Sequence, residues 1–160
     1  MNLNLLLSIG LVALTITACK KENEAPATTP AAGAAKIPFS GTYTWAFTIP
    51  GMGDQLSTHT FWPDSIHYSM AGSAYTTDYA QLHVSYDAAE QRSITVGRGG
   101  SIPKDGVYFV MFFKDITDST LMIYKHECGE GASGLTEART FGVPPANTSA
   151  DHGWNLYRRD

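Results

Sequence analysis

The sequence predicts an all-β protein, a single antiparallel β-barrel or sandwich of about 7–8 strands with little helix. Three observations lead to this fold class. Apolar and polar residues alternate with a period of two over most of the chain after residue 37, as in strands that bury one face. Turn residues, mainly Gly, Pro and Asp, separate these segments about every ten residues. No segment combines apolar spacings of three and four with helix caps.

The first strands are predicted from the clearest alternation. In residues 41–49, Tyr43, Trp45, Phe47 and Ile49 alternate with threonines and Ala46. A turn rich in Pro and Gly follows, and two further strands are separated by a Pro-Asp pair. These two strands are expected at residues 57–62 and 65–70.

Later strands complete the predicted sheet. The long strand at residues 75–86 places Leu82, Val84 and Tyr86 on one face, and Tyr79, Gln81 and His83 on the other. Three histidines, His59, His67 and His83, alternate with apolar neighbours and are expected at solvent-facing or rim positions. The remaining strands are expected at residues 92–96, 107–116 and 120–128, with a final strand that carries Trp154.

The predicted strand at residues 107–116 is apolar on both faces. Val107, Phe109, Met111 and Phe113 alternate with Tyr108, Val110 and Phe112. Something must therefore cover its second face. The cover is an apolar ligand in a barrel lumen, a partner protein, or the chain's own C-terminal segment, through Phe141, Trp154, Leu156 and Tyr157.

The chain begins with an apolar run, Leu5 to Ile16, that ends in small residues just before Cys19. This run is shorter than the roughly 20 residues that span a bilayer, so we expect residues 1–18 to be a cleaved signal peptide. The sequence Ile-Thr-Ala-Cys at residues 16–19 resembles the lipobox of bacterial lipoproteins. The resemblance implies that the Cys19 thiol carries a diacylglycerol, that the chain is cut before it, and that acyl chains anchor the protein.

Residues 19–36 are expected to form a disordered tether that joins the lipidated cysteine to a β-domain at residues 37–160. They are rich in Ala, Thr, Pro and charge and poor in aromatic residues. Residues 20–24 resemble the charged stretch of surface-exposed lipoproteins of Bacteroidetes-type bacteria. Lys20 directly after the cysteine resembles the pattern of outer-membrane lipoproteins. The cell surface and the periplasmic side both remain open as locations.

Residues 41–45, Gly-Thr-Tyr-Thr-Trp, resemble the glycine-plus-aromatic opening of lipocalin-like barrels. That family places Trp two residues after the glycine, where this chain has Tyr43. The resemblance implies a small lipocalin-like barrel and, by analogy, ligand binding.

Charge and residue spacing argue against several functions. The formal net charge is −4 and basic residues are not clustered, which argues against nucleic-acid binding. No cofactor and no metal site are predicted. His126 and Cys128 share one face of a predicted strand, but two ligands are too few for a metal site. If Cys19 is lipidated, Cys128 lacks a disulfide partner, so we expect it to be buried, with His126 beside it as a packing or rim residue.

The leading hypothesis is a non-catalytic, lipid-anchored envelope lipoprotein of the outer membrane. Its β-domain would bind an apolar ligand, a glycan or an envelope protein. Aromatic residues supply rigid amphipathic contact area. The candidate binding residues are Trp62, Tyr68 and Tyr79, which are expected to be exposed, together with Phe109 and Phe113.

Two alternatives remain from the sequence. One is a small periplasmic or surface enzyme or redox protein that uses Cys128, or Asp151 with His152. The other is a hydrolase inhibitor, because residues 69–75 resemble the serine-glycine-tyrosine loop of small lipidated lysozyme inhibitors. The disulfide common in that family has no counterpart here.

Overall fold

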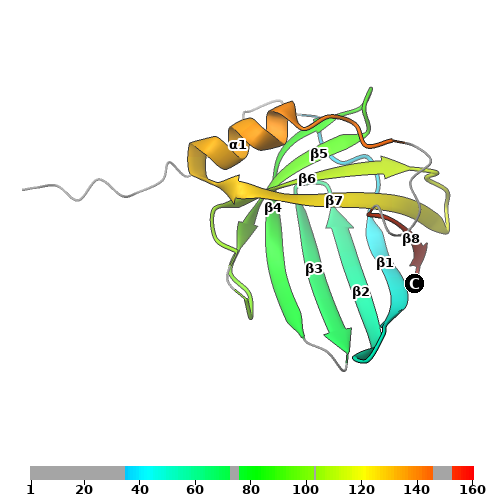
Figure 1. Ribbon diagram of the computed structural model, residues 1–160. Coiled ribbons are helices and arrows are strands. Elements are labelled where there is room, and N and C mark those ends of the chain that lie inside the picture. The colour runs from blue at the N-terminus through cyan, green and yellow to red at the C-terminus, as the bar shows by residue number, and fades with distance from the viewer. Residues whose placement is uncertain (1–34, 73–75, 103, 146–152) are drawn as a thin grey trace, which may run out of the picture.

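The computed structural model describes residues 35–72, 76–102, 104–145 and 153–160. Eight antiparallel strands follow one another around a barrel, and the last pairs with the first to close it (Figure 1). The predicted all-β antiparallel fold is confirmed as a closed barrel. Its strands are β1 (Gly41–Ile49), β2 (Gly53–Trp62), β3 (Ser65–Gly72), β4 (Thr77–Asp87), β5 (Arg92–Arg98), β6 (Val107–Lys114), β7 (Thr120–Glu130) and β8 (Trp154–Arg159).

One helix, α1 (Gly131–Thr140), follows β7 directly and lies on the outside of the barrel (Figure 1). Its ten residues are too few for a stable isolated helix, so tertiary packing must hold it in place. The helix residue Ala138 is fully buried against the barrel. Gly134 permits a close approach to β7, because a Cβ at this position would overlap the carbonyl oxygen of Gly129.

The outer face of β6 is covered by the chain itself. Tyr108, Val110 and Phe112 form one buried cluster with Ala138 of α1 and Trp154 of β8. Phe141, just after α1, packs against the same cluster. Of the three covers considered for this strand, intramolecular packing is therefore confirmed for the outer face, although Leu156 is exposed and Tyr157 faces the barrel interior.

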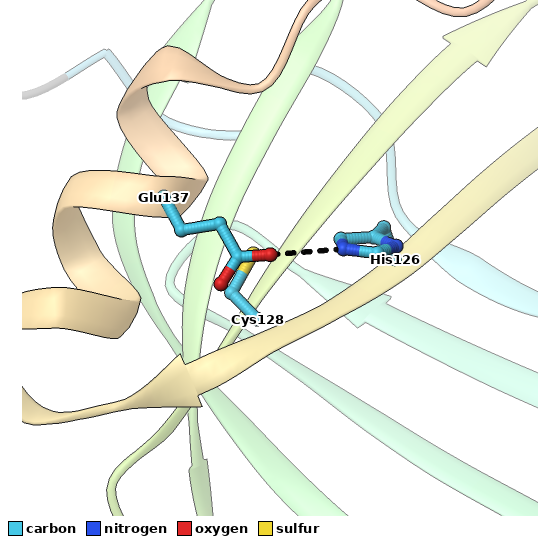
Figure 2. Close-up of side chains that lie close together, drawn as sticks. All are labelled: His126, Cys128 and Glu137. Atoms are coloured by element: carbon cyan, nitrogen blue, oxygen red, sulfur yellow. Dashed lines mark hydrogen bonds and ion pairs between the residues drawn. The ribbon is translucent and has the colours of Figure 1, made fainter.

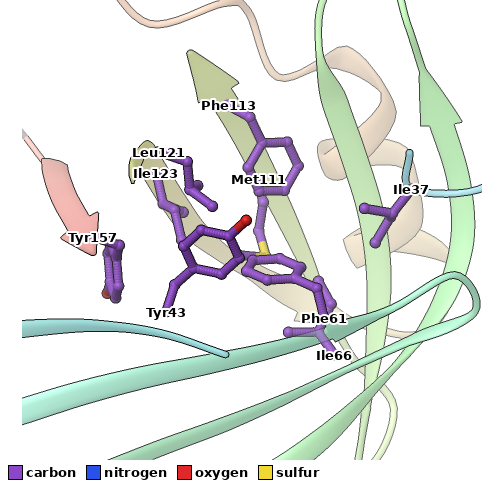
Figure 3. Close-up of a cluster of buried hydrophobic side chains, with 9 residues drawn as sticks. All are labelled: Ile37, Tyr43, Phe61, Ile66, Met111, Phe113, Leu121, Ile123 and Tyr157. Atoms are coloured by element: carbon purple, nitrogen blue, oxygen red, sulfur yellow. The ribbon is translucent and has the colours of Figure 1, made fainter. Parts of the chain in front are cut away.

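The end of the barrel at which β1 begins is closed by an apolar cluster (Figure 3). Ile37 and Phe39 come from the segment before β1, and the Phe39 ring meets Phe61 and Phe113 edge-on at centroid distances of 5.1 and 4.9 Å. Edge-to-face contacts of this kind are favourable for aromatic rings. The buried members are Ile37, Tyr43, Phe61, Ile66, Met111, Phe113, Leu121, Ile123 and Tyr157.

The barrel closes through a short seam. β1 pairs with β8 only at Tyr43 and Thr44, whereas it pairs with β2 along its whole length. Among the described residues, the second half of β1 therefore has a strand neighbour on one side only. Among the residues that the structure describes, no helix has the length and apolar character needed to cross a bilayer.

Four predicted orientations are wrong. His59 and His83 were expected at the surface or rim, and Tyr68 and Tyr79 were expected to be exposed, yet all four are buried. Alternation separates the two faces of a strand, but it does not identify the inner face when polar residues line the interior. In β4 the polar face points inward, and Leu82 on the other face is exposed.

Candidate functional site

A layer of polar side chains lies inside the barrel, next to the apolar cluster. It is contributed by alternate residues of β2, β4 and β5, which point to the same face of the sheet. Polar residues are seldom buried so completely. The buried polar residues are Gln55, Ser57, His59, Thr77, Gln81, His83, Ser93 and Thr95.

Hydrogen bonds satisfy part of this layer. The hydroxyls of Ser57 and Tyr157 lie 2.8 Å apart, and Thr95 Oγ1 donates to Gln81 Oε1 at 2.7 Å. Other buried polar atoms have no hydrogen-bond partner among the described residues, at a typical cost of about 1–3 kcal/mol each. These atoms are Gln55 Oε1, both ring nitrogens of His59, Thr77 Oγ1, Gln81 Nε2, His83 Nδ1, Ser93 Oγ and Asn155 Oδ1.

Lys125 brings a cation into this layer. It occupies an inward-facing position of β7, two residues after Ile123 of the apolar cluster. Its ammonium donates a hydrogen bond to Tyr79 Oη at 3.1 Å and lies 3.3 Å from the centroid of the Tyr68 ring. The Phe109 ring centroid is 5.8 Å away. The ammonium is therefore held chiefly by aromatic rings.

The charge of Lys125 is only weakly compensated. No carboxylate of the described residues forms an ion pair with its ammonium, since Glu127 pairs instead with Lys104 at 2.8 Å. Burial lowers the pKa of Lys125 to about 7, and the negative charge of Glu127 opposes this shift. The residue is thus a hydrogen-bond donor whose charge would gain from an anionic partner.

His59 lies beside this cation. Its ring centroid is 4.8 Å from that of Tyr68 and 5.0 Å from that of Tyr157. Burial, and secondly the charge of Lys125, hold the pKa of His59 well below its ordinary value of 6.5. The neutral ring offers one donor and one acceptor, and neither has a partner among the described residues.

The barrel interior is more accessible at the end away from the apolar cluster. There the inward-facing Phe47, Ile49 and Met70 are half-buried, whereas Tyr43 at the start of the same strand β1 is fully buried. Trp45 lies between them and packs against the apolar cluster. The Trp45 and Phe47 rings stack at a centroid distance of 4.1 Å. An aromatic surface thus leads from solvent towards the polar layer.

The structure brings together three of the five predicted binding residues. Tyr68, Tyr79 and Phe109 surround Lys125. Phe113 belongs instead to the apolar cluster. Trp62 is exposed, as expected, but it lies on the outer face of β2 and apart from the others.

Sequence reasoning missed Lys125, although the available signal was its register. It shares one strand face with Leu121 and Ile123, the two buried residues of that strand's inner face. Cys19, residues 73–75 of the inhibitor-like loop, and the pair Asp151 and His152 lie outside the described residues.

A second cluster forms on the outside of the barrel, where α1 covers β7 (Figure 2). His126 Nε2 and Glu137 Oε1 are 3.2 Å apart, and the Cys128 thiol lies beside them. Cys128 is buried, as predicted, and His126 is half-exposed at the rim. Burial, and then the charge of Glu137, raise the pKa of the Cys128 thiol to about 11. Since Glu137 comes from a helix that the sequence did not predict, its approach was not foreseen.

The closed eight-stranded antiparallel barrel is consistent with a lipocalin-like barrel at the level of architecture. No protein-family model matches the chain, and no curated protein or solved structure matches it either.

Proposed function

We propose that the barrel interior binds a small amphipathic molecule through an anionic head group, and that the protein acts as a binding protein without catalysis. The observation that carries this proposal is the placement of Lys125, a cation inside the barrel among aromatic rings and hydrogen-bonding atoms without partners. A carboxylate is the simplest head group that fits.

The head group would meet three donors. The Lys125 ammonium and the hydroxyl of Tyr79 already lie within 3.1 Å of each other. The neutral ring of His59 adds a third donor from β2. Hydrogen bonds to a charged group contribute about 1.5–3 kcal/mol each, more than those between neutral groups. An anion at this position would also offset the cost of burying the ammonium.

The apolar part of the ligand would lie along the aromatic residues that lead out of the barrel. Phe109 and Tyr68 border the cation, and Trp45 and Phe47 continue the surface to the accessible end. Buried apolar area contributes about 25 cal/mol per Å². The burial of Tyr68, Tyr79 and Phe109 favours a small molecule over a glycan or an envelope protein, since a large partner cannot enter the barrel.

The cellular setting of this proposal comes from the N-terminal segment. The lipobox-like residues 16–19 support lipidation of Cys19, and Lys20 supports delivery to the outer membrane. A lipid-anchored binding protein of the envelope would then hold its ligand close to the membrane from which amphipathic molecules arise. The proposed binding role is the same whether the domain lies on the periplasmic side or at the cell surface.

A pair of ligands that differ only in the head group tests the interior site. Dodecanoate and dodecanol are titrated into residues 20–160 by calorimetry, with circular dichroism to verify folding. We expect dodecanoate to bind and Lys125→Met to weaken it about 10- to 100-fold, because a charge-assisted bond is lost. Dodecanol affinity should change little in that variant, and Trp62→Ala serves as the control outside the barrel. Equal binding of both ligands, or an unaffected Lys125→Met variant, would refute the anionic head group.

A further inference from the structure

Three side chains with metal-binding chemistry meet on the outer face of the barrel (Figure 2). His126 and Cys128 come from β7, and Glu137 comes from α1. Their ligand atoms all lie within 4.8 Å of one another. Ligand atoms bound to one tetrahedral zinc ion at 2.0–2.3 Å lie about 3.3–3.8 Å apart, so side-chain shifts of about 1 Å or less would bring all three atoms to one ion.

The local fold explains why these residues converge. His126 and Cys128 are two apart on a strand and therefore share its outer face. The contact between Gly134 and Gly129 lets α1 lie directly on the end of β7. Glu137 follows Gly134 by about one helical turn, so its carboxylate faces the same strand. A helix held further away would leave only the two ligands of β7.

Neighbouring groups fix the orientation of each side chain. The Phe141 ring stacks on the His126 ring at a centroid distance of 4.3 Å. The backbone N–H of Gly129 donates to Glu137 Oε2 at 3.3 Å, which leaves Oε1 directed at His126. Cys128 is packed into the buried cluster between α1 and β6. Support of this kind orients the ligands of metal sites and tunes their affinity.

We propose that His126, Cys128 and Glu137 form a binding site for a divalent transition metal, with zinc as the best match. Imidazole, thiolate and carboxylate together suit a borderline-soft ion, whereas Mg²⁺ and Ca²⁺ prefer oxygen ligands. Three protein ligands leave a fourth position for water. On binding, the thiol forms the sulfur–metal bond and releases its proton to solvent. This site is independent of the ligand proposed for the interior.

The same contacts have a structural alternative, in which an ion pair between His126 and Glu137 only holds α1 against β7. The chain offers a comparison for that reading. His67 and Asp78 form another histidine–carboxylate pair, at 3.9 Å, between β3 and β4. Among the described residues, no cysteine lies beside this pair, and it is not part of a group of three potential metal ligands. In that reading the Cys128 side chain only packs in the buried cluster, and its position beside His126 and Glu137 has no further role.

Cobalt titration distinguishes the two readings. The full chain carrying Cys19→Ser, so that Cys128 is its sole thiol, is purified in non-ionic detergent without a histidine tag and treated with a chelator. We expect Co²⁺ to bind at a ratio of one with a near-ultraviolet thiolate-to-cobalt absorption band, and Zn²⁺ to displace it. Cys128→Ser should remove the band. Glu137→Gln and His126→Asn should each weaken binding by at least about tenfold, and the control His67→Asn should not.

A second measurement uses no substitution at the three ligands, so its result does not depend on whether the ligand variants fold. Zn²⁺ should raise the thermal midpoint of the same chain, because a ligand bound only to the folded state stabilises it. The proposal is overturned if no cobalt band appears, if the band survives Cys128→Ser, or if Zn²⁺ leaves the midpoint unchanged. It is also overturned if Glu137→Gln destabilises the metal-free chain while cobalt affinity stays the same, since Glu137 would then serve the ion pair alone.

Discussion

At one end of the barrel, the interior is filled by aromatic rings and aliphatic side chains that pack against one another. Two residues further along β2 and β7, it is lined by polar groups and a cation. On β2, Phe61 belongs to the first region and His59 to the second; on β7, Ile123 and Lys125 divide in the same way. Apolar packing supplies stability, whereas buried polar atoms without partners lower it. The comparison indicates that the apolar cluster holds the fold together, whereas the region around Lys125 is available for the binding role that we propose.

The largest expected effect comes from breaking the apolar half. Phe61→Ala should lower the free energy of unfolding by about 3–5 kcal/mol, because Phe61 is buried among Tyr43, Phe39 and Phe113 and its removal leaves a cavity. Urea denaturation of both proteins measures this difference. A loss below about 1 kcal/mol would contradict a close-packed end of the barrel.

The sequence predicted the antiparallel strands because alternation and turn spacing determine strands locally, but it left open whether they form a barrel or a sandwich. It did not predict α1, whose ten residues include Gly131 and Gly134 and which depends on packing against β6 and β7. It also could not place Glu137 beside His126, eleven positions away, without that helix. Such convergence depends on tertiary packing, which periodicity does not report.

The aromatic candidates were a partial success for a physical reason. Tyr68, Tyr79 and Phe109 fall on inward-facing positions of three strands, so the closed barrel brings them together. Tyr68 and Tyr79 were wrongly predicted to be exposed, because an aromatic residue on a partly polar strand face has the same sequence pattern as a surface contact residue. Only the closed barrel, in which these rings surround Lys125, shows which strand face points inward.

A second prediction concerns pH and sharpens the description of the polar half. The pKa of His59 is depressed in the folded state, so below about pH 6.5 the unfolded chain binds a proton that the folded chain does not. Stability is therefore retained above that pH and falls as the pH drops, by up to about 1.4 kcal/mol per pH unit for this one group. Lys125, Tyr68 and Tyr157 face the ring from β7, β3 and β8.

The variant His59→Phe isolates this term. Its unfolding free energy, measured by urea at pH 7.5, 6.5 and 5.5, should decline less than that of the wild type as the pH is lowered. His83, whose pKa is also lowered by burial, adds to the decline in both proteins and cancels in the difference. The half-exposed His67, on the outer face of β3, supplies a control, and His67→Asn should follow the wild type. Parallel curves for wild type and His59→Phe would show that His59 becomes protonated in the folded barrel.

The smallest expected effect on stability is also the most direct test of the comparison. In the apolar half, truncation destabilises; in the polar half, Lys125→Met should raise the unfolding free energy by about 1 kcal/mol. The methionine removes the cost of burying an ammonium and keeps most of the side-chain volume, while the hydrogen bond to Tyr79 and the cation–π contact with Tyr68 are lost. Lys36→Gln, at an exposed position, controls for the loss of one positive charge. A clear destabilisation at pH 6 would mean that the aromatic rings stabilise the cation fully, and that Lys125 belongs to the scaffold instead of to a binding site.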